Sequence, residues 1–373
     1  MRQNPSIVVA RLSWPLIVLA GLVLGGCSSE DSTPGTSATE DQGASGSVEE
    51  TTVDVNQPAV TEQHPDSGDP SRPASPSTLT LPHAALLADL VGDDQGRRSA
   101  AGDELAADPP AVQELVEIWR DGDPGQRRGA AFYAMGSYRG DDPQIEDQAI
   151  QSLKDPDARV RGLSLELVKR FPLSRFSPLL DQVLTMLRED AEGKNRATIA
   201  RMLAQWPVER DQVEGALIQS VLDDPDAAVR TAALVSMYQI ADEEPLLETL
   251  QEVIRDDQDP SLRRLAVTRL GRLGEGAAAA TSLVAQCLED EDEGVSDAAA
   301  RTLTLLGPAA VPELVMALKA SSKRTRRLAC FALGTMAASA RPAIPALEKL
   351  LQDPEEDIRE LAEGAIRNIL RVE

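Results

Sequence analysis

Apolar residues recur at helical spacing from residue 83 to the end of the chain, in a unit that repeats every 30–35 residues. Many units begin with Asp-Pro, continue with an arginine five or six residues later, and then carry small and apolar side chains, as in residues 155–168. Asp caps free N–H groups at a helix start and Pro fits the first helical position. Each such segment therefore predicts a helix.

A second helical pattern precedes this segment in each unit, for example at residues 143–154, 245–255, 308–320 and 342–352. One helix pair cannot bury its apolar face alone, so neighbouring pairs must stack. The sequence therefore predicts an all-α fold over residues 83–373, a right-handed α-solenoid of about nine antiparallel helix pairs.

Two stretches near the C-terminus are similar to HEAT repeats of the short kind found in phycobilisome lyases and deoxyhypusine hydroxylase. Gly-Pro-Ala-Ala-Val-Pro at 307–312 and Arg-Pro-Ala-Ile-Pro at 341–345 match the first helix of that repeat, and residues 353–362 match the second. The resemblance covers about 290 residues and is specific for the fold, but it says little about function.

The resemblance also implies a structural role for the recurring arginine, because in HEAT proteins such arginines form a ladder with Asp residues of neighbouring turns. The ladder residues would be Arg128, Arg161, Arg230, Arg264, Arg327 and Arg359. Two units depart from the pattern: one has Asp190-Ala191 in place of Asp-Pro, and another has Ser296 in place of the arginine.

The N-terminus resembles the signal peptide of bacterial lipoproteins. Arg2 and Arg11 precede an apolar run that is too short to span a bilayer, and the run ends in Leu-Gly-Gly followed by Cys27. The resemblance implies that residues 1–26 are removed and that Cys27 is lipidated, with sorting to an outer membrane mildly favoured by Ser28. An ordinary secretory signal or an uncleaved anchor are the alternatives.

Residues 27–82 comprise the lipid-attachment cysteine and a Ser-, Thr- and Pro-rich acidic segment without apolar periodicity. Such a composition cannot bury enough apolar surface to offset chain entropy, so we expect a disordered tether between the lipid anchor and the repeats. The protein is thus expected to be exported and attached to a bacterial membrane, facing the periplasm or the exterior.

Composition disfavours several classes of function. The chain has 61 acidic and 37 basic residues, a net charge of −24, which argues against binding nucleic acid. It has only two histidines, and no sequence pattern typical of a nucleophile, a metal site or a phosphate-binding loop is present. We therefore expect no catalytic residues, no metal, no cofactor and no small-molecule substrate. Cys287 and Cys330 are interpreted as buried thiols, with a disulfide as the alternative.

The face of the second helices that points away from the first helices is the candidate binding surface. It should carry Tyr133, Arg201, Tyr238, Arg269, Arg272 and Arg301, and such side chains often anchor interfaces. These residues favour an acidic, partly extended protein segment as partner. The basic run 323–327 is interpreted as pairing with the acidic turns before and after it, with an anionic partner as the alternative.

These features together favour a membrane-anchored scaffold for protein–protein interaction at the cell envelope. A lyase-like or other enzyme-associated HEAT factor, and a purely structural envelope lipoprotein, are the alternative hypotheses.

Overall fold

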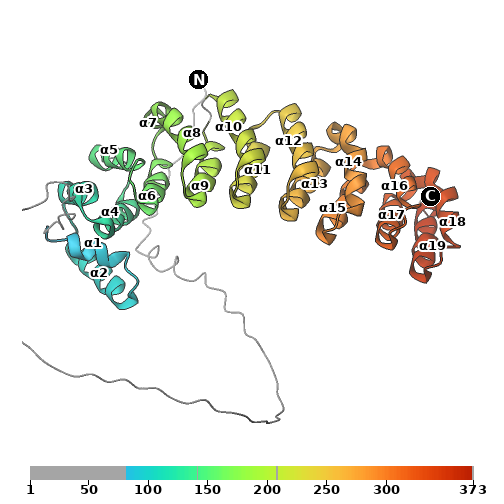
Figure 1. Ribbon diagram of the computed structural model, residues 1–373, viewed down its shortest axis with the longest axis horizontal. Helices are drawn as coiled ribbons and strands as arrows, with labels where there is room; N and C mark the ends of the chain where they lie inside the picture. Colours follow the sequence, from blue (N-terminus) through green and yellow to red (C-terminus); the bar gives the residue numbers. More distant parts are fainter. Residues whose placement is uncertain (1–80, 141, 207–208, 372–373) are drawn as a thin grey trace, which may run out of the picture. The chain divides into compact units, whose positions relative to one another are not determined.

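A computed structural model describes residues 81–140, 142–206 and 209–371 (Figure 1). Over these ranges the chain folds into helices joined by short turns, without a β-strand. None of these helices is long and apolar enough to cross a membrane. The predicted signal peptide, the lipidation site Cys27 and nearly all of the predicted tether lie outside the described residues.

The helices of this part of the chain form nine antiparallel pairs, which confirms the predicted α-solenoid. The first helices are α1 (Ala84–Leu90), α3 (Val112–Asp121), α5 (Pro143–Ser152), α8 (Leu180–Glu189), α10 (Arg210–Asp223), α12 (Glu243–Asp256), α14 (Thr281–Gln286), α16 (Val311–Ala317) and α18 (Ile344–Leu350). The second helices are α2 (Gln95–Ala107), α4 (Pro124–Ser137), α6 (Ala158–Val168), α9 (Gly193–Leu203), α11 (Ala227–Ile240), α13 (Pro260–Leu273), α15 (Glu293–Leu306), α17 (Lys323–Met336) and α19 (Glu356–Leu370). Short helical turns complete the connections. Before α8 these are α7 (Leu173–Phe176) and η1 (Ser177–Leu179), and before α14, α16 and α18 they are η2 (Gly274–Ala280), η4 (Gly307–Ala310) and η5 (Ala337–Ala343). A further turn, η3 (Cys287–Glu289), extends α14.

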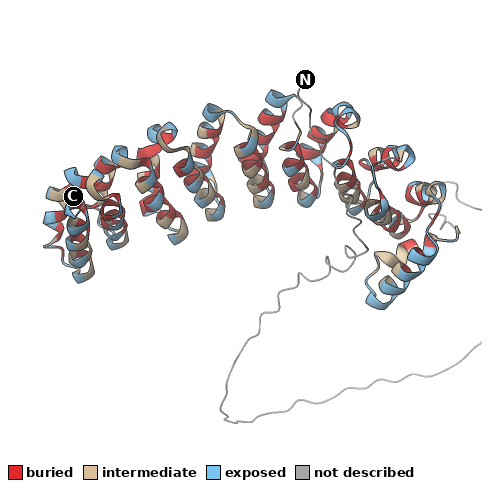
Figure 2. Ribbon diagram, turned by 180° about the vertical axis from the view of Figure 1, so that it is seen from behind, coloured by how far each residue is buried: buried red, intermediate tan, exposed pale blue. Residues whose placement is uncertain are grey.

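The second helices from α4 to α19 pack side by side in one row, each against the next. Figure 1 shows this row on the concave side of the array. We call it the inner row, and we call its surface turned away from the first helices the inner face. In Figure 2 the buried residues lie mainly where the two rows of helices face each other. Apolar side chains at helical spacing therefore form one continuous core between the rows.

Asp side chains cap many of the helices, although not always the Asp of the Asp-Pro pair. Asp123 and Asp259 cap α4 and α13 as predicted, each accepting a backbone N–H of the first turn. In residues 155–157, however, the cap of α6 is Asp157, two positions later. Asp155 accepts the backbone N–H of Asp157 at 2.8 Å instead, which leaves its carboxylate directed toward the neighbouring pair.

The first pair departs from the regular stacking, because α1 rather than α2 packs against α4. Gly129 of α4 permits this contact, since a Cβ there would lie 1.6 Å from the carbonyl oxygen of Leu87. His83, just before α1, joins the pair to α3 through a 3.0 Å contact between its Nδ1 and the Glu114 carboxylate. Burial lowers the pKa of His83, but the hydrogen bond and charge of Glu114 outweigh it and raise this pKa above its usual value.

Several aromatic side chains of the early pairs are core residues. Trp119 and Phe176 are almost fully buried, and Tyr138 packs edge-on against Phe171 with ring centroids 5.8 Å apart. Phe331, the aromatic residue that stands apart in the later pairs, is 53% exposed on α17. These four aromatic side chains therefore contribute to the core, whereas Phe331 lies on the surface.

Candidate interaction surface

Six Arg–Asp ion pairs of one recurring kind connect successive helix pairs along the array. In each, an arginine in the first turns of an inner-row helix reaches the aspartate in the loop of the following pair. The shortest N–O distances are 3.0 Å for Arg127–Asp155, 2.7 Å for Arg161–Asp190, 2.7 Å for Arg196–Asp224, 2.7 Å for Arg230–Asp257, 2.8 Å for Arg263–Asp290 and 2.9 Å for Arg326–Asp353. We call this set the ladder.

Each ladder arginine also binds its own loop. Arg196, for example, donates Nε and Nη2 to the two carboxylate oxygens of Asp224 and Nη1 to the carbonyl oxygen of Asp190 at 2.6 Å. Burial raises the pKa of Asp190, but the hydrogen bonds of Arg161 lower it below its usual value. Each guanidinium group of the ladder is thus hydrogen-bonded within the array through its nitrogens, and a structural role explains the recurrence of these arginines.

The structure corrects part of the predicted ladder. Arg161 and Arg230 lie in it, but Arg128, Arg264 and Arg327 each follow the ladder residue by one position. One position is about 100° around a helix, so Arg264 and Arg327 turn toward the inner face instead. Arg128 pairs with Asp157 of the following helix pair at 3.4 Å, so its predicted pairing with a neighbouring turn is confirmed, although with a different aspartate from the one that Arg127 binds. In these units two adjacent arginines stand at the start of the helix, and their spacing along the sequence does not show which of them forms the rung.

Arg359 also differs from its prediction as a ladder residue, because it belongs to the last helix pair. Its Nη1 donates to the carbonyl oxygens of Asp353 and Pro354, at 2.8 and 3.1 Å, as the other ladder arginines do in their own loops. No following pair lies within the described residues to supply the aspartate.

One rung of the ladder is missing between α15 and α17, and both of its members are replaced. Ser296 stands at the arginine position and Ala320, six residues before Arg326, stands at the aspartate position. Arg324 of α17 occupies this gap: it donates to the carbonyl oxygen of Asp292 at 3.0 Å and to the hydroxyl of Ser296. Because the arginine and the aspartate of this rung are replaced together, neither is left at its ladder position without the other.

The rest of the basic run 323–327 lies between acidic turns, as predicted. Lys323 pairs with Glu355 and Asp357 at 2.9 and 3.0 Å, and Arg326 belongs to the ladder. Arg327 alone in the run is exposed on the inner face and makes no ion pair with a described residue.

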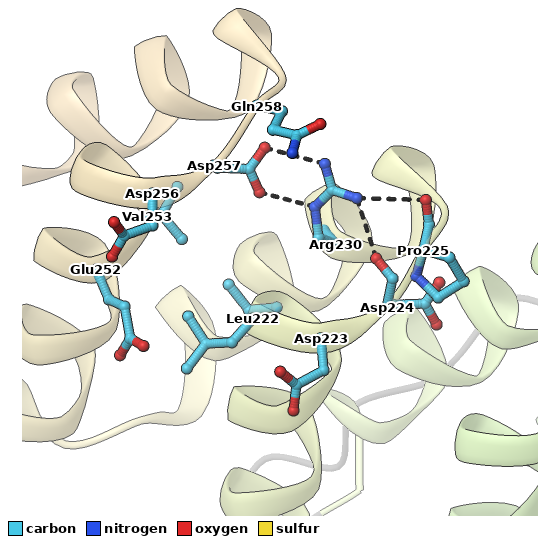
Figure 3. A pocket seen from close by; sticks show the side chains of 11 residues that line it. Leu222, Asp223, Asp224, Pro225, Arg230, Glu252, Val253, Asp256, Asp257 and Gln258 are labelled. Atoms are coloured by element: carbon cyan, nitrogen blue, oxygen red, sulfur yellow. Dashed lines mark hydrogen bonds and ion pairs between the residues drawn. The ribbon is translucent and has the colours of Figure 1, made fainter.

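An acidic recess of about 360 Å³ lies between the loops of two neighbouring pairs. Figure 3 shows Arg230 at one end, held by Asp257 and by backbone oxygens, with the carboxylates of Asp223, Glu252 and Asp256 around the space. No group of carboxylates, histidines and cysteines in the described ranges is arranged to hold a metal ion.

The two described cysteines are separate buried thiols without a disulfide between them. Burial raises the pKa of Cys287 to about 11 and that of Cys330 to about 12. Thiols with such pKa values remain protonated at neutral pH, so neither is suited to act as a nucleophile.

The predicted binding residues divide into a contacting pair and several separate side chains. The Arg269 guanidinium lies over the Tyr238 ring, 4.4 Å from its centroid, joining α13 to α11. Arg272 and Arg301 are exposed further along the inner row, whereas Tyr133 and Arg201 lie on α4 and α9. Burial raises the pKa of Tyr133, which is only half-exposed. The structure therefore gathers part of the predicted surface on α11, α13 and α15.

A second hollow of about 300 Å³ on the inner face was missed by sequence reasoning. It is lined by Asp297, Ala300, Arg301, Arg327, Leu328, Phe331 and Leu361. Phe331 comes five residues after the ladder residue Arg326, just as Arg301 comes five residues after Ser296 at the corresponding position of α15. The predicted ladder placed Arg327 at this position instead, and Phe331 was therefore not included in the predicted face.

Comparison with known proteins agrees with this architecture. A family model described as HEAT repeats matches residues 180–271, 247–320 and 280–367. The chain belongs to the HEAT-repeat family. HEAT-repeat solenoids are typically protein-interaction scaffolds rather than catalysts. A comparison with curated proteins found no match.

Solved structures with a similar arrangement of helices include the karyopherin Kap121p bound to the extreme C-terminus of the protein phosphatase Cdc14p. It shares 15% sequence identity, with a TM-score of 0.52 over 77% of this HEAT-repeat chain and 41% of the karyopherin. A mutant of Kap121p gives 13% identity and a TM-score of 0.50 over 76% and 40% of the two chains. An engineered protein gives 18% identity and a TM-score of 0.41 over 77% and 88%. At these identities the similarity concerns the fold alone, and this chain spans about two fifths of the karyopherin.

Proposed function

We propose that this HEAT-repeat protein is a lipid-anchored scaffold that binds a protein partner along its inner face at the bacterial cell envelope. The observation that carries the binding role is a group of exposed arginines on the inner face of α13, α15 and α17. They are Arg264, Arg272, Arg301 and Arg327, and none makes an ion pair with a described residue.

This group contrasts with the rest of an acidic chain. With a net charge of −24, nearby carboxylates could pair with most arginines, and the ladder shows such pairing in six places. Asp297 is the acidic residue among these arginines on α15, and it lines the same hollow as Arg301 and Arg327. Arginines left open on a concave solenoid surface suit an acidic protein segment, because a guanidinium group binds a carboxylate through two hydrogen bonds.

The lipid anchor rests on the sequence around Cys27, which resembles a lipoprotein processing site. Several acyl chains would hold the protein stably at a membrane. The residues between Cys27 and the first helix would then tether the repeats.

Two variants test the two parts of this proposal. Cys27→Ala should release the protein from membranes or leave its precursor unprocessed, as followed by fractionation and by the mass of the chain. Arg269→Glu with Arg272→Glu should reduce capture of the partner that the wild-type chain retains from solubilised membranes. Arg188→Glu with Arg341→Glu, which changes the same charge outside the inner row, is the control.

Two results would contradict it. A normally sized mature Cys27→Ala chain that still sediments with membranes would exclude the lipid anchor. Equal capture by the wild-type chain and the inner-face variant, at low and at high salt and with unchanged circular dichroism melts, would place binding elsewhere.

A further inference from the structure

Phe331 occupies an unusual place for a large apolar side chain. It lies on the inner face of α17 with 53% of its surface exposed, whereas Leu328 and Ala300 beside it are largely buried. Isolated exposed apolar residues are ordinary on protein surfaces and need no explanation. Phe331, however, lines a hollow of about 300 Å³ together with apolar atoms of Leu328 and Leu361.

Charged residues border this apolar surface on two helices. Arg301 from α15 and Arg327 from α17 line the hollow, and both are exposed and without an ion-pair partner among the described residues. Asp297 lies one turn before Arg301 and is half-exposed. The hollow therefore combines an aromatic surface with two guanidinium groups and one carboxylate, so that positive charge exceeds negative charge around it.

The position of these residues in the repeat explains why they are available for binding. Asp297 and Arg327 take the same place in α15 and α17, one residue after the ladder position, and Arg301 and Phe331 both come five residues after it. Those positions face away from the first helices, so neither set contributes to the core between the two rows. The Arg326 guanidinium forms the rung with Asp353, which leaves the adjacent Arg327 for the inner face.

We propose that this hollow binds a short acidic segment of a partner protein, in which one large apolar side chain is flanked by Asp or Glu residues. The apolar side chain packs on Phe331, Leu328 and Leu361, and carboxylates on either side accept hydrogen bonds from Arg301 and Arg327. This site specifies the partner class of the inner-face scaffold proposed above, and it rests on that function.

Charge and shape favour the acidic segment with an apolar side chain over other occupants of the hollow. A basic segment would meet two unpaired guanidinium groups, and a purely apolar segment would leave them without partners as it removed water from them. Aromatic and arginine side chains gathered in one hollow are also the types that contribute most to binding at interfaces. An acidic segment with one apolar anchor satisfies both groups together.

The test measures binding of synthetic peptides to the full chain by fluorescence anisotropy. The probe is the labelled peptide Glu-Asp-Glu-Phe-Glu-Asp-Glu, and two further peptides replace the central Phe by Gly or all acidic residues by Lys. Phe331→Ala should weaken binding of the probe at least about tenfold, and Arg301→Glu with Arg327→Glu should weaken it at least as much. Both peptide changes should have effects of the same size.

Matched variants keep the result specific. Met316→Ala removes a side chain that is 58% exposed on α16 of the same helix pair, and Arg188→Glu with Arg341→Glu reverses two exposed charges outside the inner row. These controls should bind the probe as the wild type does. Each variant is first compared with the wild type by circular dichroism, because only folded variants enter the comparison.

Three outcomes would overturn the site. They are equal binding by Phe331→Ala and Met316→Ala, equal binding of the Phe- and Gly-centred peptides, and concentration-dependent self-association that Phe331→Ala abolishes while the probe does not bind. The last would make a second copy of this chain the occupant. If Phe331→Ala leaves capture of the membrane partner intact while Arg269→Glu with Arg272→Glu abolishes it, the scaffold function stands and this site alone is wrong.

Discussion

The rung between Arg196 and Asp224 gives a quantitative test of the ladder. The two side chains are only 9% and 6% exposed, and they share hydrogen bonds of 2.7 and 2.8 Å. Asp224→Ala would leave the Arg196 guanidinium buried without its carboxylate. Breaking one member of such a buried pair costs about 3–5 kcal/mol.

Removing both members of the rung should lower the free energy of unfolding less than removing the aspartate alone. Arg196→Ser with Asp224→Ala reproduces the residues found naturally at the missing rung, Ser296 and Ala320. Without the buried charge, the remaining loss is the hydrogen bonds of the rung and of the adjoining loop, about 1–2 kcal/mol. The structure therefore predicts a strongly non-additive pair.

Hydrogen exchange of the amides in α9 and α11 is the suitable assay, because stacked repeats open locally rather than all at once. A loss of about 3 kcal/mol speeds exchange roughly 150-fold, whereas about 1 kcal/mol speeds it roughly fivefold. Thr185→Ala, at an exposed position on α8, serves as a control and should leave these amides unchanged. The single variants Asp224→Ala and Arg196→Ser are measured beside the double variant. If the double variant speeds exchange by the product of the two single factors, Arg196 and Asp224 do not act as a unit. The joint replacement of arginine and aspartate at the missing rung then has another origin.

Three further predictions follow from burial. Leu165→Ala should lower the free energy of unfolding by about 2–5 kcal/mol because Leu165 is fully buried, and Leu163→Ala, at a half-buried position, should lower it less in urea unfolding. Because the pKa of His83 is raised in the folded chain, its contact with α3 contributes fully to folding stability below about pH 6.5. This contribution is lost as the pH rises through the folded pKa, which an NMR titration measures. Cys287 and Cys330, with pKa values raised to about 11 and 12, should resist alkylation at pH 8 until denaturant is added.

Each of these three predictions has a result that would contradict it. Equal losses for the two leucine variants would contradict the packing of α6, and a histidine pKa below the ordinary value would contradict the ion pair before α1. Rapid alkylation of Cys287 or Cys330 in the native chain would contradict the burial of the two thiols.

Repetition made the architecture predictable from sequence. The apolar spacing and the Asp-Pro starts recur in enough units to determine both helices of a pair and the stacking of the pairs. The first pair was the exception, because nothing in its own sequence shows that α1 rather than α2 contacts α4. That contact depends on Gly129, a residue of the next pair.

The residues of the inner face were less predictable, because a shift of one residue in the assumed ladder position changes which side chains are expected there. Two arginines stand side by side at 127–128, 263–264 and 326–327, and spacing alone does not distinguish the one that forms the ladder rung with the next loop. The choice follows from the position of the aspartate across the interface, which only the structure supplies. Phe331 was missed for this reason.

The direction of the ladder has a practical consequence for dividing the protein into fragments. Each ladder aspartate is supplied by the pair that follows its arginine, so a chain shortened between two pairs deprives the last remaining arginine of its carboxylate. From α4 onward the junction after α15 is the exception among the described pairs, because Ser296 needs no partner there. A chain ending at Leu306 therefore exposes apolar surface but no orphaned charge, and it is the truncation point at which the remaining pairs are best able to stay folded.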